Sequence, residues 1–224
     1  MSNNFFKRSN VAADYREEAK EICDKHVDKL AITYLVYLLI SVVVMILDDL
    51  TGSTVVIQGF EIKNTWFNGV FTLICGGGFS MSLAYIAVNV YKGISPKVEN
   101  LFEGFKSFTK AFLLGILQTI YIALWFCLLF VPGIIKVCAY AMSYFIALDN
   151  PELSANECIT ESRRIMSGHK WDYFCLVFSY FGWLILCALT CGILYLWVGP
   201  RMMQATYLFY LDITGKGLEL ENEQ

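Results

Sequence analysis

Long apolar runs without a charged side chain constrain this chain more than any other feature of its sequence. The first run, residues 30–47, has eighteen residues with no Asp, Glu, Lys or Arg. As an α-helix it would extend about 27 Å, close to the ~30 Å hydrocarbon core of a bilayer. Several runs follow. We therefore predict an all-α fold, a polytopic helical membrane protein with about six transmembrane segments at residues 30–47, 66–91, 111–131, 134–148, 173–197 and 201–213.

Composition agrees with a lipid environment. Hydrophobic residues make up 57% of the 224 residues and charged residues only 17%, against roughly 25% charged in soluble domains. The net charge of −3 gives nucleic-acid binding no electrostatic basis. The eight cysteines form neither a disulfide framework nor a metal-binding pair. We expect no cofactor, no metal and no nucleic-acid partner.

The two ends of the chain are polar. Residues 1–29 hold six basic and six acidic side chains, and from Val11 onward they have helical periodicity. We predict a charged cytoplasmic helix here that continues directly into the first span. Residues 30–213 would form the membrane domain, and residues 214–224 an acidic, solvated tail.

Two polar stretches between spans each predict an amphipathic helix. In residues 92–110, Ser95 would cap the helix and Pro96 would take its first position. In residues 149–174, Asn150-Pro151 ends the preceding helix, Ser154 and Glu157 have capping-box spacing, and Gly168 suits the end. The small or apolar stripe of this second helix is Ala155, Cys158, Ile159, Ser162, Ile165 and Met166. Both helices are expected on the inner membrane surface; the alternative is a soluble helix packed on a core.

Basic residues predict the orientation. The inner segments 1–29, 91–110, 149–172 and 211–224 would hold 6, 4, 3 and 1 basic residues, fourteen in all, against three outside: Lys63, Lys136 and Arg201. The positive-inside rule then places both termini in the cytoplasm. Lys136 would have to snorkel outward or line a cavity.

Glycine and proline mark breaks and close contacts. Pro132-Gly133 and Gly199-Pro200 are each predicted to turn or break the chain after a long span. The two halves resemble each other in this respect, although chance similarity of membrane segments explains it equally well. Gly76-Gly77-Gly78 either permits close approach of another helix or forms an unwound binding segment.

No catalytic constellation is evident. The chain has no HExxH, GxSxG, Walker or GxGxxG motif, and we expect no enzyme activity. Asn89, Gln118 and Gln204 are the polar groups within or near the spans, where interhelical hydrogen bonds are favoured over a substrate path.

Two sequence blocks carry a family resemblance. The run GGFSMSLAYIAVNVYKGISPKVENLFEGFKSFTKAFLLGIL and the later elements PGIIK, DNPE-SANE-ITESRRIM and GHKW resemble bacterial integral membrane proteins of the domain-of-unknown-function family 975. The central motif also resembles the membrane domain of some glycerophosphodiester phosphodiesterases, but no hydrolase domain accompanies it. The resemblance implies a bacterial cell-membrane protein without an assigned activity.

The leading functional prediction is a non-enzymatic, multi-pass protein that acts through lipid contacts, a protein partner or a homo-oligomer. The alternative is an exporter of small molecules or peptides, with a path between the two C-terminal helical pairs lined by Lys136, Arg201 and Gln118. The motif positions expected to matter, first as structural elements, are Pro132, Gly133, Lys136, Asn150, Pro151, Ser154, Glu157, Ser162, Arg163, Gly168, Lys170 and Trp171.

Overall fold

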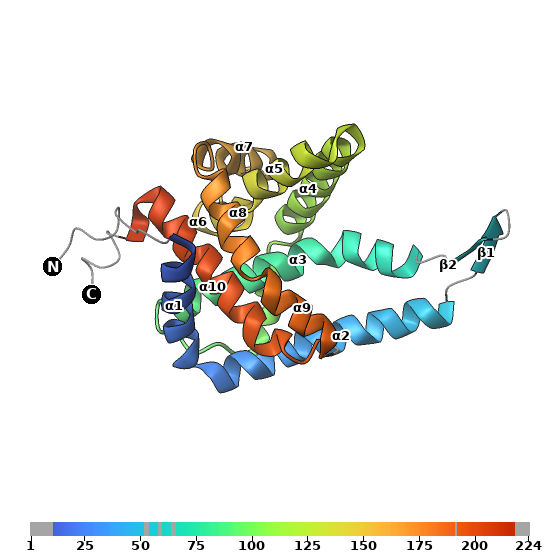
Figure 1. Cartoon of the computed structure of the whole chain (residues 1–224), viewed down its shortest axis with the longest axis horizontal. Coiled ribbons are helices and arrows are strands. Elements are labelled where there is room, and N and C mark those ends of the chain that lie inside the picture. Colours follow the sequence, from blue (N-terminus) through green and yellow to red (C-terminus); the bar gives the residue numbers. More distant parts are fainter. Residues whose placement is uncertain (1–10, 52–53, 58–59, 64–65, 191, 218–224) are drawn as a thin grey trace.

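A computed structural model describes residues 11–51, 54–57, 60–63, 66–190 and 192–217. The fold is all-α, as predicted, apart from one short β-hairpin. Figure 1 shows two long helices, α2 and α3, side by side as an arm that ends in the hairpin; the other helices gather around the opposite end of this arm.

The arm begins after a turn. Helix α1 (Val11–Asp24) stops before α2 (Val27–Thr51), and His26 N donates to Cys23 O at 3.0 Å in the two-residue turn between them. The predicted continuous helix is therefore wrong. The chain bends here because α1 packs across α8 and α10 instead of extending α2.

The far end of the arm holds two strands. Strands β1 (Thr54–Ile57) and β2 (Phe60–Lys63) pair antiparallel, and α3 (Trp66–Tyr91) follows. Asp48 Oδ1 accepts a hydrogen bond from Asn68 N at 3.0 Å, so the end of α2 is tied to the start of α3.

The first polar stretch forms a 3₁₀ helix, η1 (Val98–Phe105), rather than an α-helix capped at Ser95. Lys97 is at the N-cap position and makes no side-chain capping bond. The prediction fails because tertiary contact overrides the local signal: Gly104 N donates to Ser82 Oγ of α3 at 2.9 Å. Helix α4 (Phe108–Leu128) begins three residues later.

The turn after α4 lies earlier than predicted. Leu129 is extended, with φ −160° and ψ 141°, and separates α4 from α5 (Phe130–Tyr140). Pro132 therefore lies in the first turn of α5, where its missing N–H would have no partner within the helix. Helix α6 (Ser143–Asp149) continues the return toward the polar motif.

The last helices also turn at an unexpected place. Helix α7 (Ala155–Ile165) is followed by α8 (Lys170–Ser179), α9 (Phe181–Leu189) and α10 (Tyr195–Thr214). Gly199 and Pro200 lie inside α10, so the predicted break there is wrong. The chain turns before Tyr195 instead, where Gly192 takes the left-handed conformation with φ +84°.

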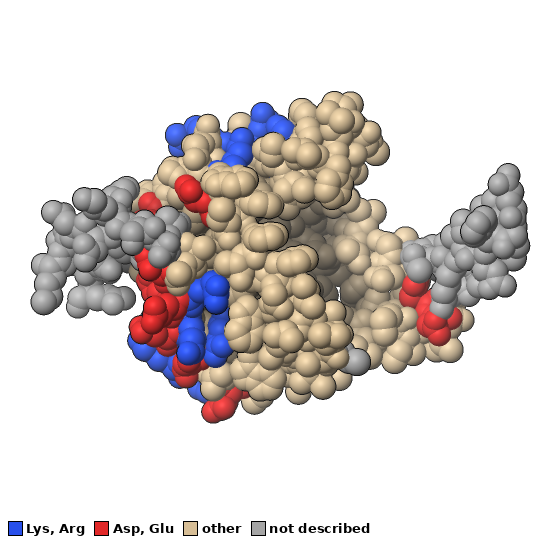
Figure 2. All heavy atoms as spheres, viewed as in Figure 1, with Lys and Arg blue, Asp and Glu red and all other residues tan. Residues whose placement is uncertain are grey.

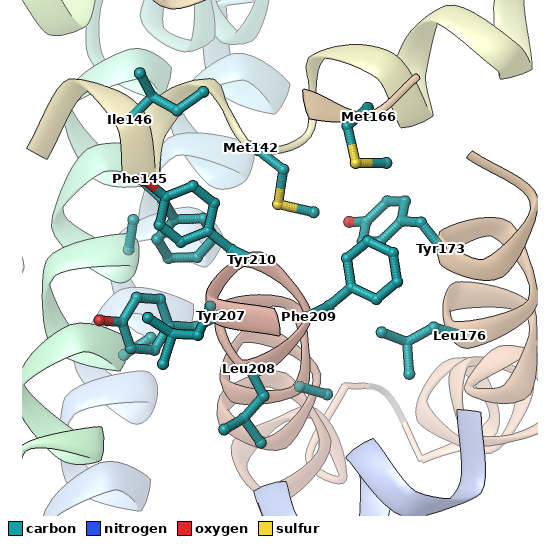
Figure 3. Close-up of a cluster of buried hydrophobic side chains, with 14 of the residues drawn as sticks. Met142, Phe145, Ile146, Met166, Tyr173, Leu176, Tyr207, Leu208, Phe209 and Tyr210 are labelled. Atoms are coloured by element: carbon teal, nitrogen blue, oxygen red, sulfur yellow. The ribbon is translucent and has the colours of Figure 1, made fainter. Parts of the chain in front are cut away.

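Helix α10 is the centre of the core. Figure 3 shows Tyr207, Phe209 and Tyr210 directed at side chains of the surrounding helices. Phe145 of α6 stacks on Tyr210 at 5.5 Å, and Tyr173 of α8 contacts Phe209 at 5.5 Å between ring centroids. Every residue from 204 to 211 is buried. The apolar character of the sixth predicted segment therefore reflects burial within the protein.

Five helical stretches in the described residues are long and apolar enough to cross a membrane. They are Val27–Thr51, Phe67–Tyr91, Phe108–Leu128, Phe130–Asp149 and Lys170–Leu189. Such lengths, with the exposed apolar surface of α2, α4 and α9, indicate a membrane protein.

Candidate functional site

The capping box predicted at the start of α7 is formed. Ser154 N donates to Glu157 Oε2 at 2.7 Å, and Glu157 N donates to Ser154 Oγ at 3.4 Å. The first of these bonds holds the pKa of Glu157 below its ordinary value. The stripe from Ala155 to Met166 packs against protein, and the position of this helix on the inner membrane surface stays a prediction.

A lysine side chain from α4 caps the C-terminal end of α6. Lys110 Nζ donates to the carbonyl oxygens of Ala147, Asn150 and Pro151 at 3.2, 2.7 and 3.1 Å. A cation suits this position because the last carbonyls of a helix lack partners and carry partial negative charge. Asn150 and Pro151 thus accept from Lys110 through their backbone carbonyls, and Lys110 fixes the start of α4 to the motif. The Asn150 side chain also donates from Nδ2 to Ile146 O at 3.2 Å.

Asp149 connects the motif to the C-terminal helix. Its Oδ2 accepts from Tyr210 Oη at 2.7 Å and from Lys216 Nζ at 2.6 Å. Lys216 of the predicted solvated tail therefore pairs with Asp149, although its side chain stays 40% exposed; residues 218–224 of that tail lie outside the described residues. Sequence reasoning missed Asp149 because its partners are 61 and 67 residues away.

Other motif residues join α7 and α8 to their neighbours. Ser162 is buried, and its Oγ donates to Ala139 O of α5 at 2.8 Å. Gly168 has φ +95°, a conformation that other residues rarely adopt, and so allows the turn into α8. Lys170 begins α8, and Trp171, 71% exposed, stacks on Phe174 at 5.4 Å.

The α4–α5 turn carries the remaining motif residues. A Cβ on Gly133 would lie 2.7 Å from the Phe126 ring, so a larger residue here would require that ring to shift. Lys136 Nζ lies 4.4 Å from the centroid of Trp125, within cation–π range. Lys136 is also close enough to exposed Arg163 and to Lys170 for like-charge repulsion.

A second cluster of charges surrounds the start of α10. Arg201 Nη2 pairs with Asp24 Oδ1 of α1 at 2.8 Å, and Arg16 lies 5.7 Å from the Tyr180 ring. Lys136 and Arg201 were both assigned to the outer side, yet each lies beside residues of the predicted inner segments. That assignment is incompatible with these contacts. Both chain turns occur earlier in the sequence than predicted, so Lys136 and Arg201 lie on the returning helices.

A cavity of about 340 Å³ lies between helices α2, α3, α4, α5, α6, α8 and α10. Its lining holds polar side chains but no charged one, and Lys136 and Arg201 are not part of it. The residues that line it are Tyr34, Ser80, Leu83, Ala84, Gln118, Ile122, Val137, Tyr140, Ala141, Tyr144, Phe145, Tyr173, Tyr195, Gly199, Met202, Met203 and Thr206.

One polar side chain of the lining is already hydrogen-bonded to another helix. Gln118 Nε2 donates to Tyr140 O at 2.9 Å, as expected for a polar group within a span. The hydroxyl of Tyr144 lies near that of Ser80, and the hydroxyl of Tyr173 lies near that of Thr206. The cavity therefore combines aromatic faces with oriented hydroxyl groups. No local motif marked it in the sequence, since its tyrosines come from five helices.

Gly77 and Gly104 set the helix spacing beside the cavity. A Cβ on Gly77 would lie 2.1 Å from Ala111 O of α4, and one on Gly104 would lie 2.2 Å from Gly78 O. Helix α3 is continuous through the three glycines. The prediction of close helix approach is confirmed, and the unwound segment is wrong.

The fold defines a helical membrane protein with an uncharged internal cavity. Residues 127–217 match the model of the family described as Protein of unknown function (DUF975), which confirms the resemblance predicted from the sequence. Neither a curated protein nor a solved structure matches the chain.

Proposed function

We propose that this is a non-enzymatic protein of the bacterial cell membrane that binds one uncharged, amphiphilic, lipid-like molecule in this cavity. The observation that carries the proposal is the cavity of about 340 Å³, with its five tyrosines and no charged side chain in the lining. Its volume is at the lower end of the range typical of small-molecule sites.

The lining favours this chemical class for two reasons. A charged ligand would lose its hydration without finding a counter-ion, which is costly in a low-dielectric interior. Tyrosine offers an apolar ring and a hydroxyl that bonds a polar head. The ligand expected is therefore one with an apolar body and a hydroxyl or ester group.

An exporter path lined by Lys136, Arg201 and Gln118 has less support. Lys136 contacts Trp125 and Arg201 contacts Asp24, so only Gln118 faces the cavity. Binding of a lipid-like partner requires only the apolar and uncharged polar side chains that line the cavity. A protein partner and self-association stay predictions, as does the cytoplasmic location of both termini.

Native mass spectrometry of protein extracted from its own membranes in mild detergent tests the proposal. Ser80→Leu would fill the cavity from α3, and Ser41→Leu, at an exposed position of α2, is the matched control. We expect one bound uncharged species on the wild type and on Ser41→Leu, and at least a tenfold lower occupancy on Ser80→Leu.

Two results would contradict the proposal. One is a wild type that carries no such species and takes up neither diacylglycerol nor a long-chain alcohol when these are added. The other is equal occupancy of Ser80→Leu and wild type, provided that both proteins melt at similar temperatures.

A further inference from the structure

We propose that the hairpins α4–α5 and α9–α10 enter the membrane from the side where α1 lies and turn within it, so that only α2 and α3 cross. Their apolar tips would contact the acyl chains of one leaflet. Each tip extends about one leaflet beyond the nearest charged helix.

The polar helix α7 lies against both legs of the first hairpin. Tyr121 Oη of α4 donates to Asn156 Oδ1 at 3.3 Å, and Ser162 Oγ donates to Ala139 O of α5 at 2.8 Å. From Tyr121 to Leu129 is eight residues, or about 12 Å of helix. The exposed side of α7 carries Arg163 and Arg164, which cannot lie deep in hydrocarbon without a large cost. The tip therefore reaches about 12 Å beyond a surface-level helix.

Charged α1 lies against both legs of the second hairpin in the same way. Arg16 covers the Tyr180 ring just before α9, and Asp24 pairs with Arg201 in α10. From Tyr180 to Leu189 is nine residues, or about 14 Å of helix. Half of a hydrocarbon core of ~30 Å is about 15 Å, so both hairpins have the length of one leaflet.

Helix α2 gives an independent measure of depth. A Cβ on Gly192, in the α9–α10 turn, would lie 3.7 Å from Leu38 Cδ1. The far end of α2 is marked by Asp48, ten residues beyond Leu38, or about 15 Å. The turn thus stops well short of the end of the crossing helices. In Figure 1 the arm of α2 and α3 likewise extends past α9 toward the hairpin.

The two tips have the composition of lipid-embedded segments. Leu128, Leu129, Phe130 and Val131 are 63–70% exposed, and Leu189 and Ile193 are 75% and 61% exposed. A loop in water would be expected to carry polar residues. Figure 2 shows charged residues gathered around α1 and near α7, whereas the surface toward the two turns is uncharged.

Helix α8, which runs from α7 to the start of α9, suits the boundary between water and lipid. Trp171, Phe174, Phe178 and Phe181 form a continuous row of stacked rings along its length, with neighbouring centroids 5.4 to 5.9 Å apart. Aromatic side chains gather at the boundary between water and lipid. A helix lying along that boundary joins the charges near Lys170 to those near Tyr180.

Single cysteines in a background without native cysteines test the depth of the tips. Phe130→Cys and Ile193→Cys report on the tips, Lys20→Cys on exposed α1 and Thr51→Cys on the far end of α2. In sealed vesicles a membrane-impermeant maleimide is applied from each side in turn. A fluorophore on each cysteine is then quenched by lipids brominated at shallow or deep acyl positions.

We expect Lys20→Cys and Thr51→Cys to label from opposite sides. Phe130→Cys and Ile193→Cys should label from neither side until detergent is added, and deep bromines should quench their fluorophores at least twofold more than shallow ones. Labelling of either tip from the side that labels Thr51→Cys would overturn the proposal, because the hairpin would then cross. Labelling from the Lys20→Cys side, or stronger quenching by shallow bromines, would also overturn it.

Discussion

Gly77 is the residue at which α3 and α4 approach most closely. A Cβ there would lie 2.1 Å from a backbone oxygen, which cannot move aside as a flexible side chain would. We expect Gly77→Ala to lower the free energy of unfolding by about 1–3 kcal/mol through overpacking.

The control for this prediction is in the same helix. A Cβ added to Gly69 would have nothing within 4 Å, so Gly69→Ala should be neutral or stabilising by up to ~1 kcal/mol. Thermal unfolding in detergent compares the two variants. Equal melting temperatures would show that the close approach is not required.

Single residues were predictable where the signal was local. Ser154, Glu157 and Gly168 were identified because caps and turns depend on residues three or four positions apart. Lys110 and Asp149 were not, because their partners lie 37 or more residues away and nothing in the intervening sequence specifies the pairing.

At the scale of elements, Asp149 holds α10 against α6. Tyr210 is 2% exposed, and its hydroxyl bonds a carboxylate. Such bonds contribute about 1.5–3 kcal/mol. We expect Tyr210→Phe to cost about that much, and Lys216→Met less than ~1 kcal/mol because that ion pair is partly exposed.

Tyr121→Phe is the matched control for Tyr210→Phe. Its hydroxyl makes a longer bond, 3.3 Å, to an exposed asparagine, so its loss should change stability by less than ~0.5 kcal/mol. If denaturant unfolding gave the same loss for both tyrosines, Asp149 would not be the anchor of α10.

Helix α7 should weaken in acid. Hydrogen bonds to Ser154 and to Arg164 lower the pKa of Glu157 and of Glu161, respectively. A carboxylate whose pKa is lower in the folded state stabilises the fold above its unfolded pKa, near 4.5. This stabilisation is lost as the pH falls through the folded pKa.

Glu157→Gln isolates this effect. At pH 7 the variant should melt at a lower temperature than the wild type. The difference should shrink as the pH falls through the folded pKa of Glu157, because the protonated side chain resembles glutamine. Melting curves recorded across this range provide the test. A difference that stayed constant or grew as the pH was lowered below 4.5 would contradict the role of the charged capping box.

Element boundaries were less predictable than elements. Apolar runs located α2, α3 and α4 to within a few residues, but proline was a poor guide to the turns. Pro132 is tolerated in a first turn, and Pro200 inside α10 is surrounded by packed side chains. Leu129 and the turn at Gly192 carry the breaks instead, and an extended leucine has no sequence signature.

At the scale of the whole molecule, hydrophobicity had two causes that composition alone does not separate. Residues 204–211 are mostly apolar and buried in protein, whereas Leu128–Val131 are apolar and exposed. Lys136 and Arg201, predicted on the outer side, instead lie beside residues of the predicted inner segments, and only the three-dimensional structure reveals these contacts. The uncharged cavity depends on the same three-dimensional arrangement.

We infer that lipid covers the arm of α2 and α3 and the two apolar turns. Photolabelling in native membrane vesicles, with a phospholipid that carries a diazirine in its acyl chain, tests this most directly. Mapping the labelled peptides should place adducts on residues 35–47, 124–131 and 185–193, with none on α1 or α7. Adducts spread evenly over the chain, or absent from these three segments, would contradict the account.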